Sequence, residues 1–168
     1  MINIRVAEPD DAPEMARVIV DTWFAAHEGQ VPVEKFRQRR EQWGYAESEQ
    51  GWRRILGEGR DGSSQAWVAT SDGRVIAVAA GEILGGGVAE VGALYVDVPY
   101  QRSGTGRRLI TAVIDHYRGV AISKLDIAVL AANQPARTFY ERLGGREAGT
   151  REDPEGLEII YSWDLDAE

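Results

Sequence analysis

The chain has 168 residues, of which 43% are hydrophobic. This length and composition suffice for one hydrophobic core but not for two, so we expect a single domain over residues 1–168. It has no cysteine and no apolar run of about eighteen residues, which excludes disulfides, thiolate-bound zinc and membrane-spanning helices; its two histidines show no ligand spacing, so we expect no metal. A net charge of −8 would repel a long polyanion, which argues against nucleic acid and favours cationic or neutral small molecules or basic peptide ends, although the same acidity also serves solubility.

The first third of the chain has the pattern of one strand followed by helices. Residues 2–7 alternate like a short strand, and the apolar residues from Met15 to Trp23 then recur at helical spacing behind an acidic start. Residues 33–57 contain two further helical patterns.

The middle of the chain has the pattern of three strands. Residues 65–70 and 74–84 are apolar runs separated by the sequence SDG, which is a good hairpin turn. Residues 88–96 then form a long apolar stretch suited to a buried central strand.

The last part of the chain alternates between helices and strands. Residues 104–118 repeat at helical intervals, and residues 124–130 have the pattern of a buried strand. A second helix follows with Asn133 as its cap, and two strands joined by the turn DPEG complete the pattern. This order predicts an α/β fold of the α+β type, with one mixed sheet and helices on both faces.

The segment YQRSGTGRRL, residues 100–109, lies between a predicted buried strand and a predicted helix. Gly104 and Gly106 allow the backbone to approach a ligand closely with its N–H groups turned outward. Arg102 and Arg107 are unfavourable at the positive end of a helix unless an anion lies between them. A tight turn would explain the glycines alone but not the arginines, so we favour a phosphate site. The spacing matches neither a P-loop nor a dinucleotide-binding fingerprint.

Two motifs resemble those of the GNAT superfamily of N-acyltransferases. The first is that family's acetyl-CoA-binding signature, Q/R-x-x-G-x-G/A after a strand, which corresponds here to Gln101, Arg102, Ser103, Gly104, Thr105 and Gly106. The second is N-x-x-A-x-x-F-Y-x-x-L-G-F, which corresponds to Asn133, Ala136, Phe139, Tyr140, Leu143 and Gly144. Three positions depart from the family pattern. Gly145 replaces the usual aromatic, with a loss of packing expected there, Pro99 lies one place later than usual, and Ser103 replaces a frequent basic residue or glycine.

The resemblance implies a GNAT-like mixed, mostly antiparallel sheet of about seven strands that binds acetyl-CoA as its cosubstrate. By the same resemblance, Asn133 would contact the pantetheine arm, cap its helix, or do both. The expected acetyl-CoA contacts are Leu94, Tyr95, Val96, Val98, Gln101, Arg102, Ser103, Gly104, Thr105, Gly106, Arg107, Asn133 and Ala136.

In that family an amine attacks the thioester directly. The resemblance implies that Tyr140 is the acid that protonates the departing sulfur. The alternative is that Tyr140 is only an aromatic residue of the core. The best candidate for the base is Glu90, because a carboxylate in an otherwise apolar strand takes up a proton more readily; it would act directly or through water. The alternative is that Glu90 meets solvent or an arginine. Glu82, on the preceding strand, is the reserve candidate for the base. His27 and His116 are weaker candidates with structural roles as the simpler explanation.

The sequence therefore predicts an acetyl-CoA-dependent N-acetyltransferase of the EC 2.3.1 class that acts on a primary amine of a small molecule or peptide. The alternatives are a non-catalytic CoA-binding or sensing module and, on the same scaffold, an O-acyltransferase or a longer-chain acyltransferase. Without an export signal we expect a cytoplasmic protein, and the edge strands would allow a homodimer. One or two aromatic residues would line the acceptor pocket, from the set Trp23, Phe24, Trp43, Tyr45 and Trp52.

Overall fold

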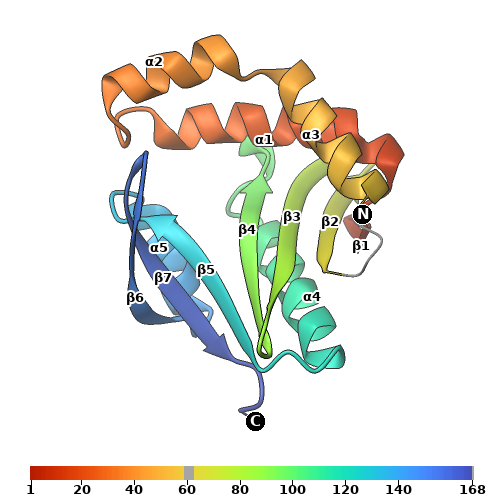
Figure 1. The fold of residues 1–168 in the computed structure, drawn as a ribbon. Helices are drawn as coiled ribbons and strands as arrows, with labels where there is room; N and C mark the ends of the chain where they lie inside the picture. Colours follow the sequence, from red (N-terminus) through yellow and green to blue (C-terminus); the bar gives the residue numbers. More distant parts are fainter. Residues whose placement is uncertain (59–62, 168) are drawn as a thin grey trace.

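Seven strands form one mixed sheet in the order β1-β2-β3-β4-β5-β7-β6 (Figure 1). The computed structural model describes residues 1–58 and 63–167. Every neighbouring pair of strands is antiparallel except β4 and β5, which are parallel. The strands are β1 (Asn3–Val6), β2 (Ser64–Ser71), β3 (Arg74–Gly85), β4 (Val88–Val96), β5 (Lys124–Leu130), β6 (Arg146–Asp153) and β7 (Gly156–Asp164). The helices are α1 (Ala12–His27), α2 (Val33–Gln42), α3 (Tyr45–Glu58), α4 (Thr105–Gly119) and α5 (Gln134–Arg142), with the short 3-10 turns η1 (Pro9–Asp11) and η2 (Val98–Tyr100).

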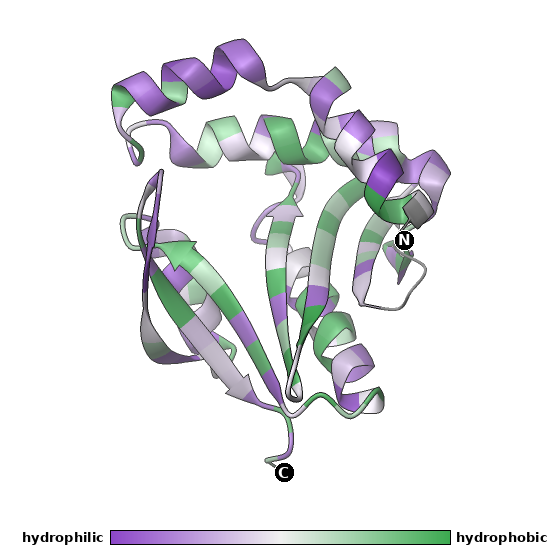
Figure 2. Ribbon diagram, viewed as in Figure 1, coloured by the Kyte–Doolittle hydropathy of each residue, from purple (hydrophilic) through white to green (hydrophobic). Residues whose placement is uncertain are grey.

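The predicted strands and helices are all present, and the helices cover both faces of the sheet as predicted. Met15 and Val18 of α1 pack with Val78 of β3 on one face. Leu109 and Val113 of α4 belong to a larger core on the other face, which α5 also joins. Helix α2 is hydrophilic along most of its length, as Figure 2 shows, and none of its residues is buried. It therefore contributes surface rather than core.

The central strands β4 and β5 separate after a short stretch of pairing. Residues 88–91 of β4 pair with residues 124–127 of β5, and no further pairing joins these two fully described strands. The separation follows a bulge in β4, where Gly92 has no partner in β3 although its neighbours on both sides do. A bulge bends its strand and increases the local twist. As a result, β4 and β5 diverge toward α1 and α2 (Figure 1).

Strand β6 forms one edge of the sheet and is exposed along nearly its whole length. An exposed edge strand can pair with another chain, so a homodimer through this edge stays a prediction.

The described parts of the chain contain no helix that is both long and apolar enough to cross a membrane. In the same parts, no three His, Asp or Glu side chains are grouped as a metal ion would require.

Candidate active site

The gap between β4 and β5 is a cavity of about 270 Å³. Its walls are residues 91–95 of β4 and residues 127–130 of β5. Helix α5 contributes Asn133, Ala136 and Tyr140 to one side, and the other side lies beside α1, α2 and the β6–β7 turn. Of the two GNAT-like motifs, the second contributes Asn133, Ala136 and Tyr140 to this cavity, where they meet Leu94 and Tyr95 of β4; none of residues 101–106 lines it.

Two tyrosine side chains face this cavity without a hydrogen-bond partner among the described residues. Tyr140 is only 6% exposed, and burial raises the pKa of its hydroxyl well above the ordinary value. Burial likewise raises the pKa of Tyr95 to about 12. Both phenols are therefore neutral at physiological pH and able to donate. Both hydroxyls therefore remain available to hydrogen-bond a ligand in the cavity.

The ring of Tyr140 is held by aromatic neighbours on its helix and on β7. It packs edge-on against Phe139 and against Trp163, with ring centroids 5.3 Å and 6.0 Å away. Trp163 also explains why a glycine follows α5. A Cβ on Gly145 would lie 2.6 Å from Cζ2 of Trp163, so the indole occupies the space that an aromatic would fill. The loss of packing expected at Gly145 is therefore wrong.

Asn133 caps α5 as predicted. Its side-chain oxygen accepts a hydrogen bond from the backbone N–H of Ala136 at 3.3 Å. The residue also lines the cavity, which keeps open the second role expected for it.

The loop before α4 presents a run of backbone N–H groups. Among the described residues, none accepts a hydrogen bond from the N–H groups of residues 102–107. Arg102 and Gly104 both have positive φ, +59° and +86°, a conformation that turns successive N–H groups toward one side. Gln101 steadies the loop by donating from its side chain to the carbonyl oxygen of Val96 at 2.9 Å. Ser103 does the same by donating to Tyr100.

The two glycines of the loop have different roles. A Cβ on Gly104 would meet nothing within 4 Å, so the space beside it is open. A Cβ on Gly106 would lie 3.3 Å from Cγ2 of Val96 and 3.5 Å from Cζ of Phe139. Gly106 therefore lets α4 pack against β4 and α5 and does not simply leave room for a phosphate. The neighbouring Thr105 is almost fully buried, whereas Val98 of η2 is exposed.

A second hollow, of about 670 Å³, lies between this loop and α5. Its lining includes Arg102 and Arg142, and Arg107 is exposed in the first turn of α4. None of these three guanidinium groups forms an ion pair with a described residue. Arg142 was missed by the sequence analysis, but the helical spacing of residues 134, 138 and 142 could have placed it on the face of α5 that lines this hollow.

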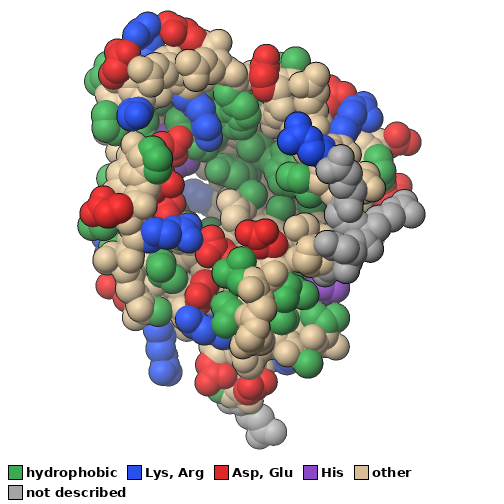
Figure 3. Space-filling view, in the orientation of Figure 1, with side chains coloured by type: hydrophobic (Ala, Val, Ile, Leu, Met, Phe, Trp, Pro, Cys, Tyr) green, Lys and Arg blue, Asp and Glu red, His purple; other side chains and the backbone are tan. Residues whose placement is uncertain are grey.

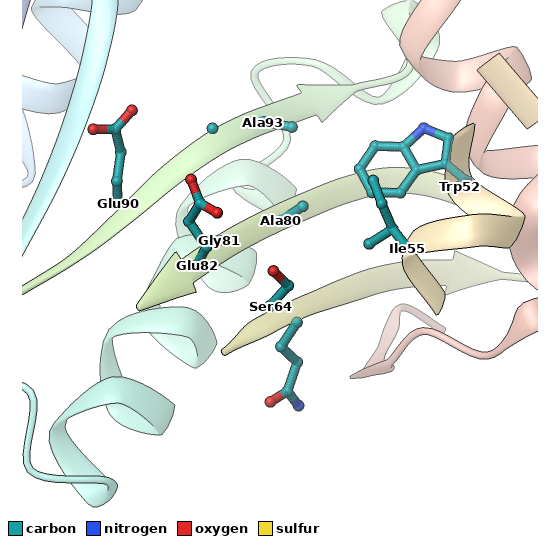
Figure 4. Close-up of a pocket in the computed structure, with 10 residues that line it drawn as sticks. Trp52, Ile55, Ser64, Ala80, Gly81, Glu82, Glu90 and Ala93 are labelled. Atoms are coloured by element: carbon teal, nitrogen blue, oxygen red, sulfur yellow. The ribbon is translucent and has the colours of Figure 1, made fainter. Parts of the chain in front are cut away.

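A third cavity, of about 380 Å³, lies on the α3 side of the sheet (Figure 4). Its walls include Glu82 and Glu90, which are directly opposite each other on β3 and β4, and Trp52 and Ile55 of α3.

The surroundings of Glu90 differ from the apolar setting expected from its strand. Arg151 of β6 contacts both carboxylate oxygens of Glu90 through its two terminal nitrogens, at 3.2–3.3 Å. The structure therefore bears out the alternative that Glu90 meets an arginine. Glu82 forms no ion pair with a described residue.

The remaining candidates are mainly structural. His116 packs edge-on against Trp67, with ring centroids 5.2 Å apart. His27 is buried, stacks on Trp23 and shares a hydrogen bond with the Trp23 carbonyl oxygen, and burial lowers its pKa. Of the five aromatic residues considered for the acceptor pocket, two line cavities, Trp23 the one between the strands and Trp52 the one beside α3. The other three members of that set, Phe24, Trp43 and Tyr45, line neither of these two cavities.

Comparisons with known proteins give a family and several similar folds. The model of the acetyltransferase (GNAT) family matches residues 22–145. PaiA N-acetyltransferase from Thermoplasma acidophilum, solved in complex with coenzyme A, is 19% identical with a TM-score of 0.81, covering 98% of this chain and 99% of that one. The ribosomal-protein-S18-alanine N-acetyltransferase from Escherichia coli is 24% identical with a TM-score of 0.72, covering 98% and 94%.

RimL, a ribosomal L7/L12 alpha-N-protein acetyltransferase also solved with coenzyme A, is 15% identical with a TM-score of 0.78, covering 99% of this chain and 96% of that one. These likenesses confirm the predicted fold. A comparison with curated proteins finds no match.

Proposed function

This chain belongs to the GNAT family of acetyltransferases, and we propose that it transfers an acetyl group from acetyl-CoA directly to a primary amine in the cavity between β4 and β5. When bound, acetyl-CoA supplies the acetyl group as a thioester. The two sides of the cavity suit two reactants, because α5 and the α4 loop lie on one side and α1 with α2 on the other.

The loop before α4 suits the phosphate groups of the donor. Unpaired N–H groups at a helix N-terminus form an anion site, and residues 102–107 offer such groups beside open space at Gly104. Arg102, Arg107 and Arg142 add positive charge to a protein whose net charge is −8. Unpaired arginines at this one place favour a multiply charged anion.

Tyr140 is the proposed general acid. As the amine nitrogen bonds to the acetyl carbon and the carbon–sulfur bond breaks, the phenol gives its proton to the departing sulfur and regains one from solvent. Its raised pKa makes the phenol a weaker acid than a thiol, so its position beside the sulfur matters more than its acidity. Tyr95 is the proposed neutral donor to the acetyl oxygen, which gains negative charge in the same step.

The proton released by the amine goes to Glu90 through water. Glu90 lines the cavity beside α3, which shares Gly92 and Ala93 with the cavity that holds the two tyrosines. Arg151 keeps the carboxylate in position. Glu82 is the reserve candidate for the base. The pH profile of turnover separates the two carboxylates, because Glu90→Gln should shift this profile. A profile that shifts only in Glu82→Gln would assign the base to Glu82.

The observation that carries this proposal is the position of Tyr140, a buried residue whose hydroxyl has no partner among the described residues and which lines the gap between the strands. Tyr140→Phe should lower kcat on the order of 10²-fold while calorimetry finds little change in the affinity for CoA. Tyr117→Phe is a matched control, because the Tyr117 hydroxyl is also buried and unpaired but lies against Gly81 inside the core. Equal turnover in parent and Tyr140→Phe would mean that Tyr140 is a core aromatic and not the acid, whereas CoA binding without turnover in the parent would favour a CoA-binding module.

A further inference from the structure

The cavity between β4 and β5 has an acidic wall on the side away from α5. Asp153, Glu155 and Glu158 line it together with one cation, Arg39. His27 also lines this side, but burial lowers its pKa, so it adds no positive charge at neutral pH. Three carboxylates thus face one guanidinium. Figure 3 shows the hollow on this face, with acidic side chains along its rim.

Of the three carboxylates, that of Glu155 is the least committed within the protein. Arg151 donates to Glu158 at 2.9 Å, and Asp153 accepts from the backbone N–H of Glu155 at 2.9 Å. The nearest cation to Glu155 is Arg39, and their closest atoms are 3.7 Å apart, beyond hydrogen-bond distance.

Arg39 has other contacts besides Glu155. Its guanidinium lies over the rings of Trp23 and Trp43, 4.9 Å and 4.6 Å from their centroids. Glu155 therefore retains the capacity to accept hydrogen bonds from a ligand.

The acidic character continues into the cavity beside α3. Glu82 of β3, Glu90 of β4 and Asp126 of β5 are direct neighbours across three strands. Like charges in such positions destabilise a sheet. Figure 4 shows Glu82 and Glu90 side by side. Arg151 and Lys124 pair with Glu90 and Asp126, but Glu82 has no ion pair within the described residues. Glu82 is thus the carboxylate of these three whose charge no described cation offsets.

Charge alone does not make a binding site, and the acidic wall is supported by two tyrosines that line the same cavity and place the reacting acetyl group beside it under the proposed function. Tyr140 is more than nine-tenths buried, lines the same cavity as Glu155, and its hydroxyl has no partner among the described residues. The hydroxyls indicate that something polar binds there, and the carboxylates indicate the sign of its charge.

We infer that the acceptor is a small primary amine with a second cationic group, such as a linear diamine, and that Glu155 binds the distal ammonium while the near amine reacts beside Tyr140. This inference rests on the proposed acetyl transfer. A diamine provides the two features that the cavity requires, one neutral amine at the tyrosines and one charge at the acidic wall. The carboxylate of an amino acid would be repelled by the same wall.

The test compares three acceptors of equal chain length: 1,4-diaminobutane, butylamine and 4-aminobutanoate. At low ionic strength kcat/KM should fall in that order, with the diamine at least about tenfold above butylamine, and the gap should narrow as salt is added. Glu155→Gln should lower the diamine-to-butylamine ratio of kcat/KM about fivefold, chiefly through KM. Glu155→Asp, which keeps the charge, should retain part of the ratio.

Glu152→Gln is the matched control, because Glu152 lies in the same hairpin, is exposed and does not line the cavity. It should leave the ratio unchanged. Equal kcat/KM for diamine and butylamine, or equal loss for both in Glu155→Gln, would overturn the inference and leave acetyl transfer intact. Binding of CoA in calorimetry without acetylation of any of the three amines would instead count against the proposed function.

Discussion

Adding one methyl group at Gly145 should destabilise the protein by a predictable amount. The new Cβ of Gly145→Ala would lie 2.6 Å and 2.9 Å from two carbons of the Trp163 ring and 3.0 Å from the carbonyl oxygen of Tyr140. The indole cannot move away freely, because it is 8% exposed and its Nε1 donates to the carbonyl oxygen of Leu143 at 3.1 Å. Overpacking of this kind costs about 1–3 kcal/mol. For a domain of this size, that corresponds to a Tm lower by about 2–12 °C.

Thermal unfolding followed by circular dichroism or calorimetry measures this loss directly. A second variant separates ring overlap from backbone effects: in the background of Trp163→Leu, Gly145→Ala should cost much less than it does alone. The difference is the coupling energy between the two positions. Turnover should also fall in Gly145→Ala, because a displaced indole presses on Tyr140. An unchanged Tm, or the same loss in both backgrounds, would refute the role given to the indole.

Three further predictions concern the site. Gly104→Ala should weaken CoA binding in calorimetry, because φ is +86° and the methyl points into the open space beside the N–H groups. Gly106→Ala should instead mainly lower Tm. Equal effects of the two variants on CoA affinity and on Tm would contradict this division. Tyr95→Phe should lower kcat/KM for the amine about tenfold without changing CoA affinity, and an unchanged rate would mean that its hydroxyl meets no reactant. His27 has a lowered pKa, so the unfolded chain binds its proton more readily. The contribution of neutral His27 to the free energy of unfolding should therefore be fully present above pH 6.5 and fall as the pH drops below it. When Tm is measured from pH 8 to 5, it should fall less steeply in His27→Phe than in the parent.

The order of strands and helices could be predicted from the sequence because each is a local pattern. The bulge at Gly92 also leaves a local signal, since a lone glycine inside an apolar strand indicates a bulge or a close backbone approach. The cap at Asn133 and the hairpin turn before β3 depend only on neighbouring residues.

Partners distant in the sequence could not be predicted in the same way. Arg151 reaches Glu90 across 61 positions, and nothing in either local pattern indicates that contact. The compensation of Gly145 by Trp163 likewise requires the register of β7 beside α5. Glu155 lies in a turn, where an acidic residue has no periodic context, so its place at the cavity becomes evident only in three dimensions.

The opening between β4 and β5 also bears on the order of events during turnover. It lies between two strands of one sheet, with α5 on one side and α1 and α2 on the other, and the proposed direct transfer requires both reactants to be bound there together. The chain also has no cysteine that could carry the acetyl group between them. Initial-rate plots with both reactants varied should therefore give intersecting lines, the signature of a ternary complex, and not the parallel lines of a substituted enzyme.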